Sequence, residues 1–148
     1  RFEFKGTIEG RTIVDDYAHH PKAIKATIKL GRLFLNEHHK YKRLIAIFQP
    51  HRFSRVSEFF IEFANELALA DKIIITNIYG AGEKNINNIS SSLISNEIFK
   101  LNQNVKTVKD NNEIRKNFNH LTKENDLIIN MGAGDCHNLW QILTSQKY

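Results

Sequence analysis

Short apolar runs alternate with amphipathic segments along most of the chain, and this alternation restricts the fold more than any other feature. Residues 43–48 (RLIAIF), 72–78 (KIIITNI) and 126–131 (DLIINM) are typical of strands that are buried on both faces of a sheet. Residues 105–108 predict a weaker strand at an edge. Strands that alternate with helices form right-handed crossovers, so the sequence predicts an α/β fold with a mostly parallel sheet covered by helices on both faces.

The segments between these strands have the apolar spacing of helices. Proline at position 21 suits the first turn of a helix, and Ser54 is the predicted N-cap of the next one. The predicted helices cover residues 21–39, 54–67, 90–101 and 114–121, with a last helix after residue 135. Because Cys136 lies on the apolar face of that last helix, we interpret it as a core residue and not as a nucleophile.

Residues 1–16 differ from the rest of the chain, because "RFEFKGTIEGRTIVDD" alternates at its start and has glycines at positions 6 and 10. This pattern predicts a pair of short strands joined by a turn. The chain has 148 residues, of which 41% are hydrophobic, and this suits one domain over residues 1–148 with a sizeable core.

Composition argues against several classes of protein. No apolar run approaches the length of about 18 to 20 residues that a membrane span needs, and the first residues resemble neither a signal nor a transit peptide. A single cysteine allows no disulfide within the chain, so the simplest interpretation is a cytoplasmic protein. The net charge of +5 is scattered over many segments, which disfavours nucleic acid as a partner.

Polar loops follow the predicted strands at the same edge of the sheet. They are "DDYAHHP" (residues 15–21), "QPHRFSR" (49–55), "NIYGAGE" (77–83) and "MGAGD" (131–135). In parallel sheets, ligands bind outside the carboxyl ends of the strands, where helix N-termini present free N–H groups. The sequence therefore predicts one ligand site shared by these loops.

Each loop also allows a purely structural interpretation. His51, Arg52 and Arg55 could grip a carboxylate or phosphate at a helix N-terminus, or the arginines could pair with acids at the surface. Gly132 and Gly134 could cradle a phosphate or form a tight turn, and the dinucleotide fingerprint would require glycine where this chain has His137.

The acids and histidines of these loops leave similar alternatives. Asp135 could contact a ligand or cap the last helix, and Asp15 and Asp16 could form an ordinary turn at a strand end. His19 and His20 could bind a metal, but adjacent histidines point apart and no third ligand lies nearby, so we predict no metal site.

The four loops, in this order and at these spacings, closely resemble the C-terminal domain of the bacterial Mur ligase family, specifically the member that adds L-alanine to UDP-N-acetylmuramate. The opening "RFEFKG" is similar to the end of the family's hinge into that domain. The resemblance extends over essentially the whole chain. It implies a Rossmann-like fold and an ATP-dependent ligase of peptidoglycan precursor synthesis, which forms an amide bond through an acyl phosphate.

The resemblance also implies roles for individual residues. Arg1, Asp16 and Tyr17 would contact ATP, and His51, Arg52 and Arg55 would bind the anionic parts of the substrates. His19 is a candidate catalytic residue, the role of His20 is left open, and Gly132, Gly134 and Asp135 are possible loop contacts. The Mg²⁺ ligands and the glycine-rich phosphate loop of the family belong to a central domain. The chain should therefore be inactive without the family's N-terminal and central domains.

Two alternatives stay open at this point. The related ligase that recycles a murein tripeptide resembles the chain around "DDYAHHP" but departs at "QPHRFSR". The chain could also be a stand-alone nucleotide- or anion-binding module that has kept the fold without the chemistry. The coding sequence before Arg1 discriminates such a module from a ligase, because a G-K-[ST] loop upstream indicates a ligase.

Overall fold

The computed structural model describes residues 1–145 of the chain. Its strands are β1 (Glu3–Ile8), β2 (Arg11–Asp16), β3 (Arg43–Phe48), β4 (Lys72–Ile75), β5 (Val105–Thr107) and β6 (Asp126–Met131). Its helices are α1 (Pro21–Glu37), α2 (Phe53–Leu67), α3 (Ser92–Leu101), α4 (Asn111–Lys116), α5 (Phe118–Leu121) and α6 (Leu139–Thr144), with a 3₁₀ turn, η1 (Asp135–Asn138), before α6. The predicted domain extent of residues 1–148 includes residues 146–148, which lie outside the described residues.

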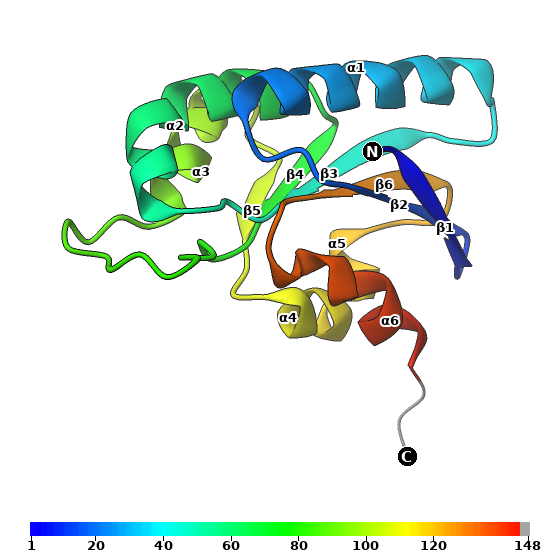
Figure 1. Ribbon diagram of the computed structural model, residues 1–148. Helices are drawn as coiled ribbons and strands as arrows, with labels where there is room; N and C mark the ends of the chain where they lie inside the picture. Colours follow the sequence, from blue (N-terminus) through cyan, green and yellow to red (C-terminus); the bar gives the residue numbers. More distant parts are fainter. Residues whose placement is uncertain (146–148) are drawn as a thin grey trace.

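The strands form one sheet in the order β1-β2-β6-β3-β4-β5. The pair β1 and β2 is antiparallel and all other neighbouring strands are parallel. Helices α1, α2 and α3 cover one face and α4, α5 and α6 cover the other (Figure 1). The predicted three-layer α/β fold, the N-terminal strand pair and the edge position of β5 are confirmed.

Side chains from the buried strands alternate between two cores, one on each face of the sheet. In β3, Leu44, Ala46 and Phe48 pack toward α1, α2 and α3, whereas Ile45 and Ile47 pack toward the other helices. Both faces are covered by helices of the same chain, because each apolar run buries its odd and even positions against a different layer.

Some predicted boundaries were wrong. Helix α2 begins at Phe53, so Ser54 is a helical residue and Arg52 holds the N-cap position. The predicted helix 114–121 is two helices, because the Asn117 side chain donates to the carbonyl of Glu113 and its backbone leaves the helical region.

Strand β6 comes last in the sequence but lies between β2 and β3 in the sheet. The chain leaves β2 through α1 to reach β3, and it returns from β5 to place β6 between them. The carboxyl ends of β2, β6 and β3 therefore lie side by side, at the topological switch point where α/β sheets bind ligands. No helix among residues 1–145 is long and apolar enough to cross a membrane.

Candidate functional site

The loops that follow β2, β3, β4 and β6 meet at the carboxyl edge of the sheet, as the sequence predicts. The rings of Tyr17 and His137 lie 4.5 Å apart between centroids, and those of His19 and His51 lie 5.7 Å apart. His51 also stacks on Tyr79 at 5.6 Å. Side chains from distant parts of the sequence therefore form one continuous surface across this edge.

Asp16 ends β2 beside a small hollow. Its Oδ1 accepts a hydrogen bond of 2.8 Å from the N–H of Ala18, and its Oδ2 lies 3.2 Å from the backbone nitrogen of Arg1. The hollow has a volume of about 140 Å³ and is lined by Arg1, Asp15, Asp16, Tyr17 and His137, together with Glu3 and Lys5. Asp16 therefore forms the turn expected at a strand end, and its carboxylate also lines the hollow.

Asp15 points into the same region but is more enclosed. Its Oδ1 accepts a hydrogen bond of 3.3 Å from Asn130, and its Oδ2 lies 3.8 Å from Nδ1 of His137. Burial raises the pKa of the Asp15 carboxyl because the charged form loses its hydration. Asp15 thus belongs to the wall of the hollow.

The glycines before η1 are required by close packing. Gly132 has a φ of +153°, and a Cβ at Gly134 would lie 2.6 Å from Oε1 of Gln49 and 2.7 Å from Cγ of Tyr79. Gln49 holds this loop, because its Nε2 donates to Asp135 over 2.6 Å and its Oε1 accepts from the N–H of Cys136 over 3.2 Å. Asn138 holds the N-cap position of α6 and Gly134 that of η1, so the interpretation of Asp135 as the cap of the last helix was wrong.

The basic side chains after β3 surround the start of α2. Nη1 of Arg55 lies 3.1 Å from Nδ1 of His51 and donates to the His51 carbonyl over 3.2 Å. Because a guanidinium only donates, Nδ1 of His51 is the acceptor. Burial, followed by the charge of Arg55, lowers the pKa of His51. The Arg52 side chain is 46% exposed, and its backbone, with a φ of +74°, donates to the Tyr79 carbonyl.

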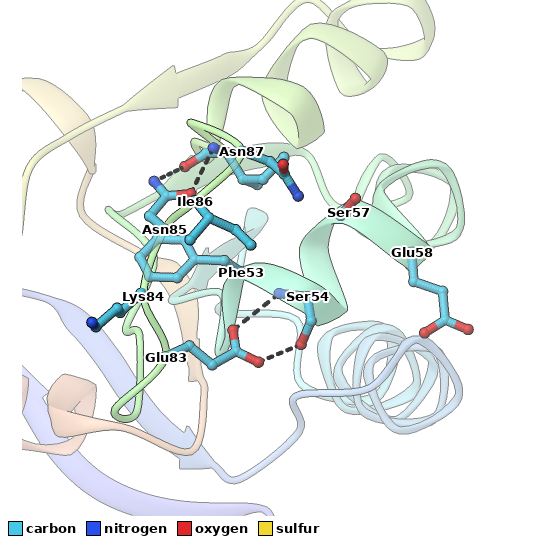
Figure 2. Close-up of a pocket in the computed structure, with 10 residues that line it drawn as sticks. Phe53, Ser54, Ser57, Glu58, Glu83, Lys84, Asn85, Ile86 and Asn87 are labelled. Atoms are coloured by element: carbon cyan, nitrogen blue, oxygen red, sulfur yellow. Dashed lines mark hydrogen bonds between the residues drawn. The ribbon is translucent and has the colours of Figure 1, made fainter.

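Glu83 supplies the carboxylate at the N-terminus of α2. It accepts from the N–H of Ser54 over 3.1 Å and from the Ser54 hydroxyl over 2.5 Å, as Figure 2 shows. These hydrogen bonds lower the pKa of Glu83. Its Oε2 also lies 3.9 Å from Nη1 of Arg52. The alternative in which the arginines pair with acids at the surface therefore holds in part for Arg52.

A wider pocket of about 550 Å³ lies beside this contact. It is open to solvent and is lined by the first turns of α2 and by the loop over residues 83–89 (Figure 2). Ile86, at the edge of that loop, is 81% exposed. Asn85 closes the loop, because its amide donates to the Ile89 carbonyl and accepts from the Ile89 N–H, both over 2.8 Å.

The remaining histidines and the cysteine have structural neighbours. The His20 ring packs edge-on against Phe59, away from the His19–His51 contact, so the two adjacent histidines point apart as expected. The thiol of Cys136 is buried, which raises its pKa to about 12 and confirms the core interpretation. Within residues 1–145, no group of three or more His, Cys, Asp or Glu side chains could hold a metal ion.

Sequence reasoning missed several residues that shape the site, namely Gln49, Tyr79, Glu83, Asn130 and His137. Most of them lie inside the loops that the sequence marked, so their position was visible. A polar residue directly after a buried strand is the signal that could have identified Gln49, and a carboxylate within a glycine-containing loop could have identified Glu83.

Comparison with known proteins bears on the whole chain. Residues 1–134 match the family model described as "Mur ligase, glutamate ligase domain". A protein of Prochlorococcus marinus subsp. pastoris named UDP-N-acetylmuramate–L-alanine ligase is 61% identical over 99% of this chain, which covers 32% of that relative. A protein of the same name from Caldanaerobacter subterraneus is 43% identical over 94% of the chain, which covers 29% of it. The chain thus spans about a third of the length of these relatives.

Solved structures show the same fold. A domain from a putative UDP-N-acetylmuramate:L-alanyl-gamma-D-glutamyl-meso-diaminopimelate ligase of Haemophilus ducreyi has a TM-score of 0.68 and 26% identity, covering 97% of this chain and 98% of that one. A murein peptide ligase from Psychrobacter arcticus has a TM-score of 0.73 and 20% identity, covering 99% of this chain and 30% of that one.

Proposed function

The chain belongs to the Mur ligase family, and we propose that it is the C-terminal domain of an ATP-dependent ligase that joins L-alanine to UDP-N-acetylmuramate. The observation that carries this proposal is the 61% identity over nearly the whole chain to a relative with that name. The domain would complete the active site of a longer enzyme. The free, buried Cys136 is compatible with the cytoplasm as the place of the reaction.

The proposed reaction has two steps. ATP transfers a phosphoryl group to the lactyl carboxylate of UDP-N-acetylmuramate, which leaves ADP. The amino group of L-alanine then attacks the acyl phosphate, forming the amide and releasing phosphate. The substrates are anions, and the arrangement of charges at the carboxyl edge supports their binding in two separate places. Each place is supported by different side chains.

The hollow after β2 is the proposed contact with ATP. Asp16 keeps an acceptor oxygen near the surface while the N–H of Ala18 fixes its orientation, which suits a hydrogen bond from a ribose hydroxyl. Tyr17, which is 59% exposed, offers a ring face beside it. The Arg1 side chain is 87% exposed and is proposed to reach the ATP phosphates.

The basic group after β3 is the proposed contact with the muramoyl and alanine carboxylates. Arg55 is oriented by two contacts to His51, and Arg52 retains exposed donors beyond its long contact with Glu83. A guanidinium binds a carboxylate through paired N–H groups, and orientation in advance lowers the entropy lost on binding. Gly132, Gly134 and Asp135 would line the site as loop contacts.

His19 is the candidate catalytic residue on this chain. Its Nδ1 lies 2.7 Å from the Tyr17 carbonyl, which can only accept, so Nδ1 carries the hydrogen and Nε2 of the neutral ring is an acceptor. That nitrogen is suited to take a proton from the ammonium group of alanine, which leaves the neutral amine free to attack the acyl phosphate. Magnesium ions and the ATP phosphates are proposed to be held mainly by the other domains of the enzyme.

A second candidate is the ligase that adds a whole tripeptide to the same sugar nucleotide. The Haemophilus ducreyi domain, whose name describes a ligase of this tripeptide, matches 97% of this chain. Its identity of 26% is well below the 61% and 43% of the alanine ligases, and this difference favours alanine as the substrate. A stand-alone binding module is the third interpretation.

The test uses the full-length enzyme encoded by the gene. Phosphate release is measured with ATP, magnesium and UDP-N-acetylmuramate, adding L-alanine in one assay and the murein tripeptide in another. The proposal expects release that depends on L-alanine, and release with the tripeptide alone would contradict it. A gene with no G-K-[ST] loop before Arg1 and no turnover would indicate the stand-alone module.

A further inference from the structure

His137 connects the loop after β6 with the end of β2. Its Nε2 lies 2.7 Å from the carbonyl oxygen of Gly132, and its Nδ1 lies 3.8 Å from Oδ2 of Asp15. Its ring also faces Tyr17, with 4.5 Å between centroids and 53° between planes. Three neighbours from two strand ends therefore meet at one imidazole, whose side chain is 24% exposed.

The contact with Gly132 fixes where the imidazole carries hydrogen. A carbonyl oxygen can only accept, so Nε2 of His137 is the donor. The Asp15 carboxylate lies beside the other ring nitrogen, Nδ1, at a distance of 3.8 Å that is longer than a hydrogen bond. The hydrogen bond to Gly132 is therefore the contact that orients the ring.

The surroundings of this pair contain other charged groups. Lys5 and Glu3 of β1 line the same hollow, and Asn130 of β6 donates to Asp15 from the other side. Asn130 is fully buried, and its Oδ1 has no hydrogen-bond partner among the described residues. The pair therefore lies in an enclosed polar network where the loss of one partner leaves others unsatisfied.

The Tyr17 side chain packs against the His137 ring. No hydrogen bond to its side chain is present within residues 1–145, and the side chain is largely exposed. The ring of His137 is the aromatic group that packs on it. Position 132 offers no side chain that could support Tyr17 in place of His137. The φ of +153° at Gly132 disfavours any other residue, and a Cβ there would lie 2.7 Å from Sγ of Cys136.

We propose that His137 is a positioning residue for nucleotide binding: anchored on Gly132 and lying beside Asp15, it holds the ring of Tyr17 at the mouth of the hollow. This inference rests on the proposed function, in which Tyr17 lies beside ATP. His137 itself touches no substrate in the proposal. It acts by keeping the Tyr17 ring in its binding position before ATP arrives.

Two variants of the full-length enzyme separate the parts of this role. His137→Phe keeps a ring beside Tyr17 but removes both ring nitrogens, whereas His137→Gln keeps an amide donor for Gly132 and removes the ring. With the loss of one buried hydrogen bond, His137→Phe should raise the KM for ATP about tenfold. Because His137→Gln removes the ring that packs on Tyr17, it should raise the KM for ATP at least as much. The KM values for UDP-N-acetylmuramate and alanine should stay unchanged in both variants. His39→Phe, at an exposed histidine after α1, is the matched control.

A second measurement makes failure of this inference distinct from failure of the proposed function. In ¹⁵N NMR spectra of the 148-residue chain, Nε2 of His137 should carry hydrogen whether or not the full enzyme uses alanine. An unprotonated Nε2 would overturn the inference. So would a KM for ATP in His137→Phe within about twofold of an active wild type. A wild type without alanine-dependent turnover contradicts only the proposed function, and equilibrium binding of ADP to the two variants then replaces the KM comparison.

Discussion

The carboxyl edge of the sheet has two halves that use their polar groups differently. The braced half consists of Asp15, Gln49, Asn130, Asp135 and His137, which bond mainly to one another and to backbone. The open half consists of His51, Arg52, Arg55, Tyr79 and Glu83. Its side chains are partly exposed, and its ion pair, Arg52 with Glu83, is long at 3.9 Å.

This difference separates shape from binding capacity. Buried polar groups in the braced half must be satisfied within the protein, because an unpaired buried donor or acceptor is costly. They therefore fix the loop geometry around the proposed nucleotide hollow. In the open half, the partly exposed charges of Arg52 and Glu83 gain little from their mutual pairing. The guanidinium donors of Arg52 stay available for an incoming anion.

The largest effect is expected from breaking the braced half. Gln49→Leu removes two hydrogen bonds and leaves the buried N–H of Cys136 without a partner, so the free energy of unfolding should fall by about 2–3 kcal/mol. Urea unfolding of the chain measures this. Gln103→Leu, at an exposed position, is the control and should stay within about 0.5 kcal/mol of the wild type. Equal effects of the two variants on the free energy of unfolding would contradict the claim that the hydrogen bonds of Gln49 stabilise the braced half.

Asp16→Ala tests the nucleotide side directly. Loss of a charge-assisted hydrogen bond of about 2 kcal/mol should raise the KM for ATP roughly thirtyfold in the full-length enzyme, with smaller changes for the other substrates. Asp16→Asn is the matched variant, because it keeps an acceptor for the N–H of Ala18. An unchanged KM for ATP in the alanine variant would remove Asp16 from the nucleotide site.

Arg52→Ala tests the open half. It should raise the KM for L-alanine or UDP-N-acetylmuramate about tenfold, the effect of one lost ionic contact. Stability should change by less than about 0.5 kcal/mol, since the contact with Glu83 is exposed and long. Steady-state kinetics and urea unfolding are measured together, with Arg115→Ala on α4 as the control. A large loss of stability without a kinetic effect would show that Arg52 stabilises the fold and does not bind a substrate, which contradicts the role given to the open half.

The smallest effect concerns the pH dependence of stability. Burial raises the pKa of Asp15 in the folded chain above its ordinary value of 3.8. Protonation of Asp15 therefore contributes to the stability of the fold, and this contribution is fully present at pH values below 3.8. This contribution is lost as pH rises through the raised pKa. Asp15→Asn cannot ionise, so its stability relative to the wild type should increase as pH rises from about 3 toward neutrality. A relative stability that falls over this range, measured by thermal unfolding, would show that Asp15 is stabilised as a carboxylate.

The sequence predicted more of the fold than of the site. The runs at residues 43–48 and 126–131 match β3 and β6, because a strand buried on both faces needs nearly continuous apolar side chains. The N-cap of α2 was predicted wrongly. The preference of serine for N-cap positions favours Ser54, whereas in the structure Ser54 lies inside the helix and donates to the carboxylate of Glu83. The ligand roles of Arg1, Asp16, Tyr17, His19, His51, Arg52 and Arg55 stay predictions.

By itself, the sequence determined which segments form the sheet and which edge gathers the polar loops. Periodic burial and the rules of parallel connection are enough for that, and they explain why "DDYAHHP" and "QPHRFSR" lie together. Only the tertiary structure decided the partners of each polar group. Gln49 meets Asp135 across 86 positions of the chain, and Ser54 meets Glu83 across 29. Such pairs depend on how closely the loops pack, and no periodic pattern in the sequence encodes that distance.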